Sequence, residues 1–565
     1  MRTNWKRALA VVAASACAAV LTTNSNAQTP CQGSTGPDVI VGDITGPWNY
    51  SATGGGTVEA LSLGTYSCNM GTTNLGWHAN TNQHPVIGGE LYRFRVVNGA
   101  GQFDQVGISW LKHGFFALSN NLCCSGCQGT DGSELGVRCS DPYTAERNGS
   151  QGGLGPRYQV NASTGFFTYP PPHPAGGNTG RLEVLDSDLQ SGARYFGNCQ
   201  YIAPDDSAAG NDNNNCSYRE ISVSGSSGAW SFGMIGTTQR EKPAILAWQT
   251  CESGVTVNNV DIPSDGRIMV GFKATDLQNG TFHYEYMVYN QNSHESIRSF
   301  ALPIPSGTTL TNVEFHDITY RGGDGVGGVN QSGTDWTFTN NGTSVNWAGQ
   351  TFAQNNNGNA IRWGSAYSFR FDANASPVSG TLSLGGFRTG ASAQTTGDVP
   401  GGPIAGTPFC SGDGSLGTLC PCFNLGNSGL GCANSVNPDG AGLTGAGSVS
   451  PDNVVLTASG ELPTALSIIL QSDTPNFSGQ VFGDGLRCIA GHLYRMYTKN
   501  AVGGVVTAPS GGDPSITARS AALGDPIAPG STRYYQSWYR DPNATFCPAP
   551  QGSTFNVTSG FQITW

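Results

Sequence analysis

The chain has 565 residues, which is too many for one ordinary core, and only 12% of them are charged, so neutral polar groups must cover most of the surface. Its 81 glycines and the absence of long runs of good helix formers after residue 30 disfavour a helical fold and predict a mainly β, multidomain protein. The net charge of −11 disfavours non-specific binding to nucleic acid.

The first 27 residues have the pattern of a secretory signal peptide. Three basic residues precede an apolar run from Ala8 to Leu21, and the segment ends at the small residue Ala27. Its removal takes away three positive charges and no negative charge, so the net charge changes from −11 to −14. No later stretch of the sequence approaches the about 18 apolar residues of a membrane helix. We therefore expect a secreted protein without a transmembrane segment, located outside the cell, in the periplasm or on the cell surface.

Residues 28–219 are predicted to form a loop-rich N-terminal domain that disulfides cross-link. Strand-like patterns are clear only at 91–97 and 181–185, whereas four cysteines fall between residues 123 and 139. An Asn- and Asp-rich run at 211–215 offers oxygen ligands of the kind that calcium prefers, although such a run also forms turns.

The sixteen cysteines of this exported chain are interpreted first as disulfides. Cys17 lies in the signal peptide, which leaves 15 in the mature chain. Six of these follow residue 408, and nine precede residue 252. If pairs form within domains, the unpaired cysteine belongs to the N-terminal group.

The candidate functional residues of the N-terminal domain are three histidines and two residues that follow the cysteines: His78, His84, His113, Tyr143 and Arg157. His78, His84 and His113 could together bind copper or zinc, because imidazole suits both metals. Alternatively the histidines and Tyr143 could act as acid and base while Arg157 neutralises a carboxylate, as eliminative cleavage of an acidic polysaccharide requires. Spacing alone does not choose between these alternatives and a cross-linked loop without a site.

Residues 220–388 are predicted to form a β-sandwich-like domain. Every second residue from Phe282 to Val288 is aromatic or apolar, and the residues between them, from His283 to Tyr289, form a second, mixed set. A polar turn then leads into another strand-like stretch. This pattern predicts a strand, a turn and a strand with one face buried. Further short strands separated by Gly, Asn and Asp clusters are typical of a sandwich.

A linker is predicted at 389–408, because this stretch is rich in Gly, Ala, Thr and Pro and contains no Lys or Arg. Residues 409–565 then form a cysteine-rich β module, with strands expected at 454–457, 466–471, 493–497 and 534–539. The six cysteines of the module are an even number, so we expect three disulfides within it.

Short motifs distinguish the C-terminal module, namely FCSGDG at 409–414, CPC at 420–422, GCANS at 431–435, GDGLRC at 483–488 and WYRDP at 538–542. In these motifs it resembles a module at the end of proteins in an uncharacterised family of large modular secreted bacterial proteins. The stretch 282–290, with FHD at 315–317, GTDW at 333–336 and AIRWG at 360–364, is similar to another segment of such proteins. The resemblance implies export and a modular architecture, and it implies no activity or catalytic residue.

The function that the sequence favours is extracellular binding of a carbohydrate or of a cell surface. The β-domains could present aromatic rings to sugars, although large aromatic residues of sandwiches mostly lie in cores; the candidates are Trp77, Trp110, Trp336, Trp363 and Trp538. The alternative is an extracellular enzyme acting on a polysaccharide, through either the lyase-type site or the copper or zinc site. The sequence contains no Gly-x-Ser-x-Gly, His-Glu-x-x-His or Walker motif. It does not indicate an oligomeric state.

Overall fold

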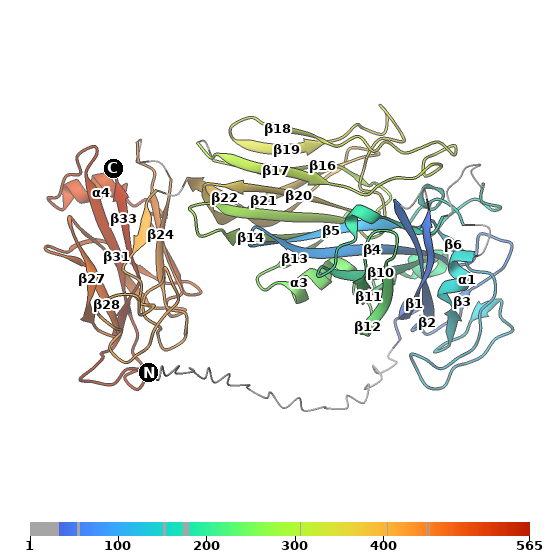
Figure 1. Cartoon of the computed structure of the whole chain (residues 1–565), viewed down its shortest axis with the longest axis horizontal. Coiled ribbons are helices and arrows are strands. Elements are labelled where there is room, and N and C mark those ends of the chain that lie inside the picture. The colour runs from blue at the N-terminus through green and yellow to red at the C-terminus, as the bar shows by residue number, and fades with distance from the viewer. Residues whose placement is uncertain are drawn as a thin grey trace, which may run out of the picture.

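The computed structural model describes residues 33–53, 57–150, 154–172, 180–305, 307–403, 405–447, 449–450 and 452–565. The predicted signal peptide lies outside these residues. The chain is mainly β, as its composition predicts, and its helices are short. Figure 1 shows the C-terminal module at one end of the molecule, beside β22 of the remaining body.

A ten-stranded sheet forms the N-terminal part of the chain. Its order is β1 (Val39–Thr53), β2 (Val58–Asn69), β9 (Leu182–Leu185), β5 (Ala100–Ile108), β4 (Val86–Val97), β10 (Arg194–Ile202), β11 (Cys216–Ser224) and β12 (Ser231–Gln239), with β6 (Lys112–His113) on β4 and β8 (Ser140–Tyr143) on β2. The sheet curls, so strands that are far apart in its order come into contact. Ser217 of β11, for example, donates a hydrogen bond to the carbonyl oxygen of Val41 in β1 at 2.7 Å. It continues past residue 219, where the sequence pattern predicts a domain end.

The loop-rich part of this region lies between β5 and β9. It contains β6, β7 (Glu134–Leu135), β8, α1 (Ala145–Ser150) and η1 (Arg157–Gln159), and β7 pairs with β3 (Leu75–Gly76). The Cys68–Cys123 disulfide joins the loops to β2, and the Cys127–Cys139 disulfide closes a short loop. Cross-linked loops on a sheet hold their side chains in place, which is the condition that a site in this region requires. The remaining short helices before the sandwich are η2 (Asp186–Asp188), α2 (Pro204–Ala209), η3 (Ala244–Ala247) and α3 (Trp248–Cys251).

Two five-stranded sheets form the predicted sandwich. One has the order β13 (Thr256–Asp261), β14 (Arg267–Asp276), β15 (Phe282–Asn290), β20 (Ala366–Ala373), β17 (Leu310–His316), and the other β18 (Thr337–Asn340), β19 (Ser344–Ala348), β16 (Ile297–Pro303), β21 (Ala375–Gly386), β22 (Ser392–Pro403). Aromatic residues fill the space between them; the rings of Phe300 and Phe369, for example, stack at 4.7 Å. The predicted linker is therefore wrong over Ser392–Pro403, because these residues pair with β21 and bury Val399 in this core.

Strand β15 is buried on both faces, whereas its alternation predicts one buried face. Tyr284, Tyr286 and Val288 pack in the sandwich core. Met287 and Tyr289 pack in a second core, shared with Tyr92 and Trp248 among others, between the sandwich and the N-terminal sheet. The strand is thus in the middle layer of three stacked sheets, and a sequence period of two cannot distinguish a solvent face from a second buried face.

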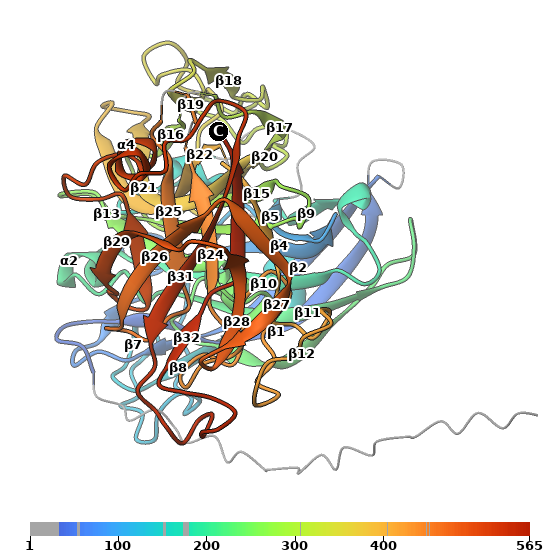
Figure 2. The ribbon, with the colours of Figure 1, turned by 90° about the vertical axis from the view of Figure 1, so that its left-hand side faces the viewer.

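The C-terminal module has a six-stranded sheet, a three-stranded sheet and a hairpin (Figures 1 and 2). The first contains β23 (Thr407–Phe409), β33 (Gly560–Thr564), β31 (Thr532–Arg540), β26 (Leu466–Ser472) and β29 (Tyr494–Asn500), with β32 (Phe555–Val557) on β31. The others are β24 (Gly442–Ala446), β25 (Val455–Ser459), β30 (Val505–Ala508), and β27 (Thr474–Phe482) with β28 (Gly485–Ala490); one helix, α4 (Ile516–Ala522), is added.

All six cysteines of the module are paired within it, as predicted: Cys410–Cys488, Cys420–Cys432 and Cys422–Cys547. Among the described residues of the N-terminal group, Cys199, Cys216 and Cys251 are free thiols, and the first two are buried. The five disulfides named above, all between described residues, indicate that the chain folds in an oxidising compartment. In the described ranges no helix has the length and apolar character needed to cross a membrane.

Candidate functional site

The structure brings two of the predicted site residues, His84 and His113, into contact. His84 lies two residues before Val86, and Val86 pairs with His113 where β6 meets β4. The Nε2 atom of His84 lies 3.1 Å from Nδ1 of His113, and the two rings are nearly perpendicular. The third predicted ligand, His78, contacts this pair through its carbonyl oxygen, which is 3.1 Å from Nδ1 of His84.

Tyr143 lies in a different cluster of side chains. Its ring packs against Phe115, and the ammonium group of Lys112 lies 5.8 Å from its centre. Burial raises the pKa of the Tyr143 hydroxyl well above its usual value and lowers the pKa of Lys112 to about 8. A phenol with a raised pKa is a poor base at neutral pH, so this position does not favour the role that the lyase-type alternative requires.

Arg157 is engaged in a buried ion pair. Its guanidinium lies 2.6 Å from Oε1 of Glu90, and both side chains are at most 7% exposed. The guanidinium also packs over the ring of Trp363, whose indole nitrogen donates to the Arg157 carbonyl oxygen at 3.1 Å. Glycines leave the room that it needs: a Cβ at Gly88 would lie 2.5 Å from Nη2. These contacts hold the N-terminal loops against the sandwich.

A recess beside Arg157 is too small for a sugar. It is lined by Trp110, Tyr320, Arg362 and Trp363 among others, and its volume is about 30 Å³. Since one water needs roughly 10–15 Å³ measured in this way, the recess has room for about two waters. Arg157 therefore does not face a polysaccharide cleft.

The asparagine-rich run considered for calcium stabilises the beginning of the described chain instead. The side-chain amide of Asn211 donates to the carbonyl oxygens of Thr35 and Pro37, and Asn215 donates to Asp206. Within the described ranges there is no group of three His, Cys, Asp or Glu side chains arranged to hold a metal ion.

Three of the five candidate sugar-binding tryptophans are core residues. Trp77, Trp336 and Trp363 are at most 4% exposed, whereas Trp110 and Trp538 are half-buried. The indole nitrogen of Trp110 donates to Asp324, so this ring is fixed at the contact between the N-terminal loops and the sandwich. Large aromatic residues in these sheets thus fill cores, as their size favours.

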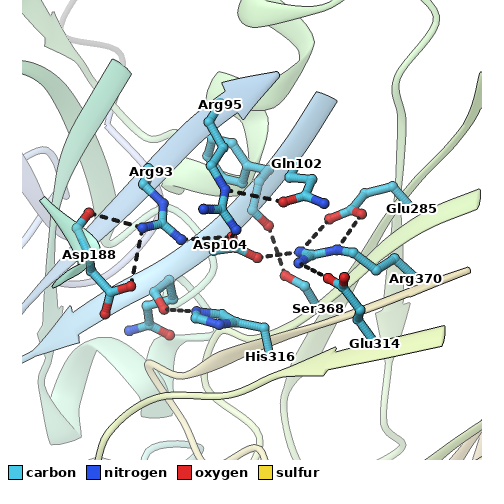
Figure 3. A network of polar contacts seen from close by, with 12 residues as sticks. Arg93, Arg95, Gln102, Asp104, Asp188, Glu285, Glu314, His316, Ser368 and Arg370 are labelled. Atoms are coloured by element: carbon cyan, nitrogen blue, oxygen red, sulfur yellow. Dashed lines mark hydrogen bonds and ion pairs between the residues drawn. The ribbon is translucent and has the colours of Figure 1, made fainter. Parts of the chain in front are cut away.

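A network of buried charges joins the N-terminal sheet to the sandwich (Figure 3). Arg370 of β20 contacts Asp104 of β5 and donates two hydrogen bonds to Glu285, while Arg93 of β4 pairs with Asp104 at 3.2 Å and with Asp188 at 3.1 Å. Burial raises the pKa of Asp104, but Arg370, His316 and Arg93 lower it by more, so Asp104 is ionised. The charges of this network are paired with one another and link the N-terminal sheet to the sandwich. We call this network the clamp between the two layers.

His283 extends this network at its edge. Its Nδ1 atom lies 2.7 Å from Asp372 and its Nε2 atom 3.3 Å from Glu285. Burial lowers the pKa of His283, but the two carboxylates outweigh it, so the pKa is raised above 6.5. Each ring nitrogen contacts a different carboxylate, so His283 bridges Asp372 and Glu285.

The second sandwich sheet carries a polar hollow with a volume of about 400 Å³. It lies where β18 begins and β19 ends, since Thr337 pairs with Ala348. Seven of its lining residues have side chains that are able to form hydrogen bonds: Ser332, Thr334, Asp335, Thr337, Gln350, Gln354 and Asn359. The volume is in the range of roughly 300–1,000 Å³ that small-molecule sites have.

Buried contacts fix the floor of this hollow. Asn359 donates from its amide nitrogen to Asp317 and to the carbonyl oxygen of Thr334, and its amide oxygen accepts from Tyr367 at 2.6 Å. The indole nitrogen of Trp336 donates to the Asn359 carbonyl oxygen at 2.9 Å. Burial raises the pKa of Asp317 to about 6. The floor is therefore rigid, whereas the side chains of the rim are exposed.

No protein-family model and no curated protein matches the sequence. Among solved structures, the full-length major pilin SpaD from Corynebacterium diphtheriae is similar over 81% of this chain and 82% of that chain, at 9% sequence identity and a TM-score of 0.14. A TM-score this low supports no conclusion about fold or function. The resemblance of the C-terminal module to large modular secreted bacterial proteins therefore stays a prediction.

Sequence patterns do not single out the hollow. Its residues are common polar types spread over 332–359, and the region reads as a polar loop. One signal could have indicated it: hydroxyl and amide side chains are dense there while charges are few. That composition is also the composition of ordinary turns, which is why it carries little weight before the loops are placed.

Proposed function

We propose that the protein is an extracellular carbohydrate-binding protein and that the polar hollow of the sandwich binds a neutral polysaccharide. The observation that carries the proposal is the lining of the hollow, which consists mainly of hydroxyl and amide side chains. Each sugar hydroxyl both donates and accepts a hydrogen bond, so it is recognised by a mixture of donors and acceptors. A neutral ligand also suits a chain in which 12% of the residues are charged.

The rim presents donors and acceptors in fixed positions. The side-chain oxygen of Gln354 accepts hydrogen bonds from Thr351, and that of Gln350 accepts one from Asn355 at 3.0 Å. Each glutamine is thereby oriented with its amide NH₂ group as the donor for a ligand. The exposed carboxylate of Asp335 is the charged acceptor, which can bind two neighbouring sugar hydroxyls at once.

Binding to soluble oligosaccharides and polysaccharides tests the proposal. The full chain should bind at least one neutral glycan of a panel, and Asp335→Ala should weaken that binding by roughly 10-fold or more, because a hydrogen bond to a charged group contributes about 1.5–3 kcal/mol. Asp276→Ala, which removes an exposed carboxylate from the same sandwich, is the matched control and should leave the affinity unchanged. Equal affinities of the two variants, or no binding across the panel, would contradict the proposal.

A glycoside hydrolase with its site in the hollow, which differs from the lyase-type and metal alternatives of the N-terminal domain, makes a different prediction for the same panel. Hydrolysis of a glycosidic bond requires two carboxyl groups that flank the bond. Asp335 is the one carboxyl group among the lining residues of the hollow, because Asp317 lies behind Asn359 and does not line it. We therefore expect binding without release of reducing ends. If reducing ends appear, and Asp317→Asn abolishes them, the hollow is a catalytic site.

A further inference from the structure

The histidine pair of the N-terminal loops is held in an arrangement suited to a metal ion. Nδ1 of His84 lies 3.1 Å from the carbonyl oxygen of His78, which can only accept a hydrogen bond. Nδ1 therefore carries the proton, and the lone pair of His84 is on Nε2, where it accepts a hydrogen bond from Nδ1 of His113. An ion bound between the rings replaces this hydrogen bond, and the proton of His113 then lies on its other ring nitrogen, Nε2. A backbone carbonyl on the far nitrogen is the usual way in which proteins orient a metal-binding imidazole.

Packing keeps the two rings in place. The ring of Phe167 lies 5.2 Å from that of His84 and 5.1 Å from that of His113, measured between centroids. His84 is 2% exposed. His113 is half-buried, which leaves a route from solvent to the pair.

The separation of the two nitrogens fits two bonds to one ion. With bonds of about 2.0 Å, nitrogens 3.1 Å apart subtend an angle of about 100° at the metal, which lies between the ideal square-planar and tetrahedral values. We propose that Nε2 of His84 and Nδ1 of His113 form a two-imidazole site for copper(II), with water in the remaining positions.

Copper is the metal that this pair favours. Zinc sites use three or four protein ligands, whereas among the described residues no third His, Cys, Asp or Glu completes such a set around the pair. With few ligands the affinity depends strongly on the metal, and copper(II) has the highest affinity of the divalent first-row ions for nitrogen ligands. The role of His78 is to orient His84 through its carbonyl oxygen, and its ring is not required.

The experiment uses the untagged, metal-free full chain, titrated with copper(II) in the presence of glycine as a competing ligand. We expect one copper per chain and an electron paramagnetic resonance spectrum with two imidazole nitrogens. His84→Ala and His113→Gln should each reduce the nitrogen count to one and weaken binding by more than about 10-fold, the loss that even an outer contact of a metal site can cause. Zinc(II) should bind less tightly than copper(II).

Two matched variants separate this site from other histidines. His78→Ala keeps the backbone carbonyl, and His492→Ala removes an exposed imidazole of the C-terminal module, so neither should change the affinity or the spectrum. Circular dichroism and melting of each variant establish that it is folded; if His84→Ala is not folded, His113→Gln decides. Copper binding that is unchanged in His113→Gln, or a wild-type chain that binds no more tightly than the variant carrying both His84→Ala and His113→Gln, would overturn the proposal.

Discussion

Asp104 of β5 and Arg370 of β20 form a buried ion pair although they are 266 positions apart in the sequence. Their side chains are at most 3% exposed. Arg93 and Glu285 extend the pair on its two sides, so each charge at this contact has an opposite partner. The N-terminal sheet and the sandwich are therefore joined by polar contacts as well as by the apolar core that they share.

Asp104→Asn should destabilise the contact between the N-terminal sheet and the sandwich by about 3–5 kcal/mol. The substitution leaves Arg370 and Arg93 with less negative charge in a buried place, and uncompensated buried charges are costly. Urea unfolding measures the effect. Asp261→Asn, which removes the carboxylate that pairs with Arg267 and is 66% exposed, should cost less than about 1 kcal/mol. Similar losses in both variants would show that the buried network is not a clamp.

The stabilisation contributed by His283 should decrease as the pH rises. Its pKa in the folded chain is above 6.5 because Glu285 and Asp372 outweigh the effect of burial. Protonated His283 therefore stabilises the fold below the pKa of the unfolded chain, and this contribution disappears as the pH rises through the folded pKa. The difference in urea midpoint between wild type and His283→Gln should be larger at about pH 5.5 than at about pH 9. A difference that grows with pH would contradict the assignment.

The disulfides Cys420–Cys432 and Cys422–Cys547 should contribute unequally to the stability of the C-terminal module. Cys422–Cys547 closes a loop with a separation of 125 residues, and Cys420–Cys432 one of 12. The entropy of loop closure predicts losses of about 5 kcal/mol and about 3 kcal/mol when each pair is replaced by alanine. Thermal unfolding of the two double variants in the full chain compares them. If removal of the short loop is the more damaging change, chain entropy does not govern these bridges.

The three cysteines that are free thiols in the described part of the chain should differ in their reaction with a thiol reagent. Cys199 and Cys216 are buried, whereas Cys251 is partly exposed and its pKa is raised to about 11 by burial. We expect no labelling of the first two in the native protein, slow labelling of Cys251, and labelling of all three after unfolding without reductant. Peptide mass spectrometry identifies each site. Rapid native labelling of Cys199 would show that the N-terminal sheet opens at β10.

Local features of the sequence suffice for the fold class and for the C-terminal disulfides. Neutral polar composition and alternation of period two act within a few residues, so they predict a mainly β chain, and an even number of cysteines in one module predicts pairing inside it. Sequence reasoning also selected His84 and His113 as candidates, because this region combines titratable side chains with closely spaced cysteines.

The positions of Tyr143 and Arg157, the second buried face of β15 and the polar hollow were decided only by the tertiary structure. His283 and Glu285 alternate with aromatic residues as solvent-facing side chains would, yet β5 packs against this strand, and Asp372 and Arg370 of the neighbouring strand β20 pair with them. Residues 392–403 have the composition of a linker and become an edge strand because β21 lies beside them. The reason is physical: the partner that buries, pairs or neutralises a side chain comes from a distant segment, and no local pattern of residues specifies which segment that is.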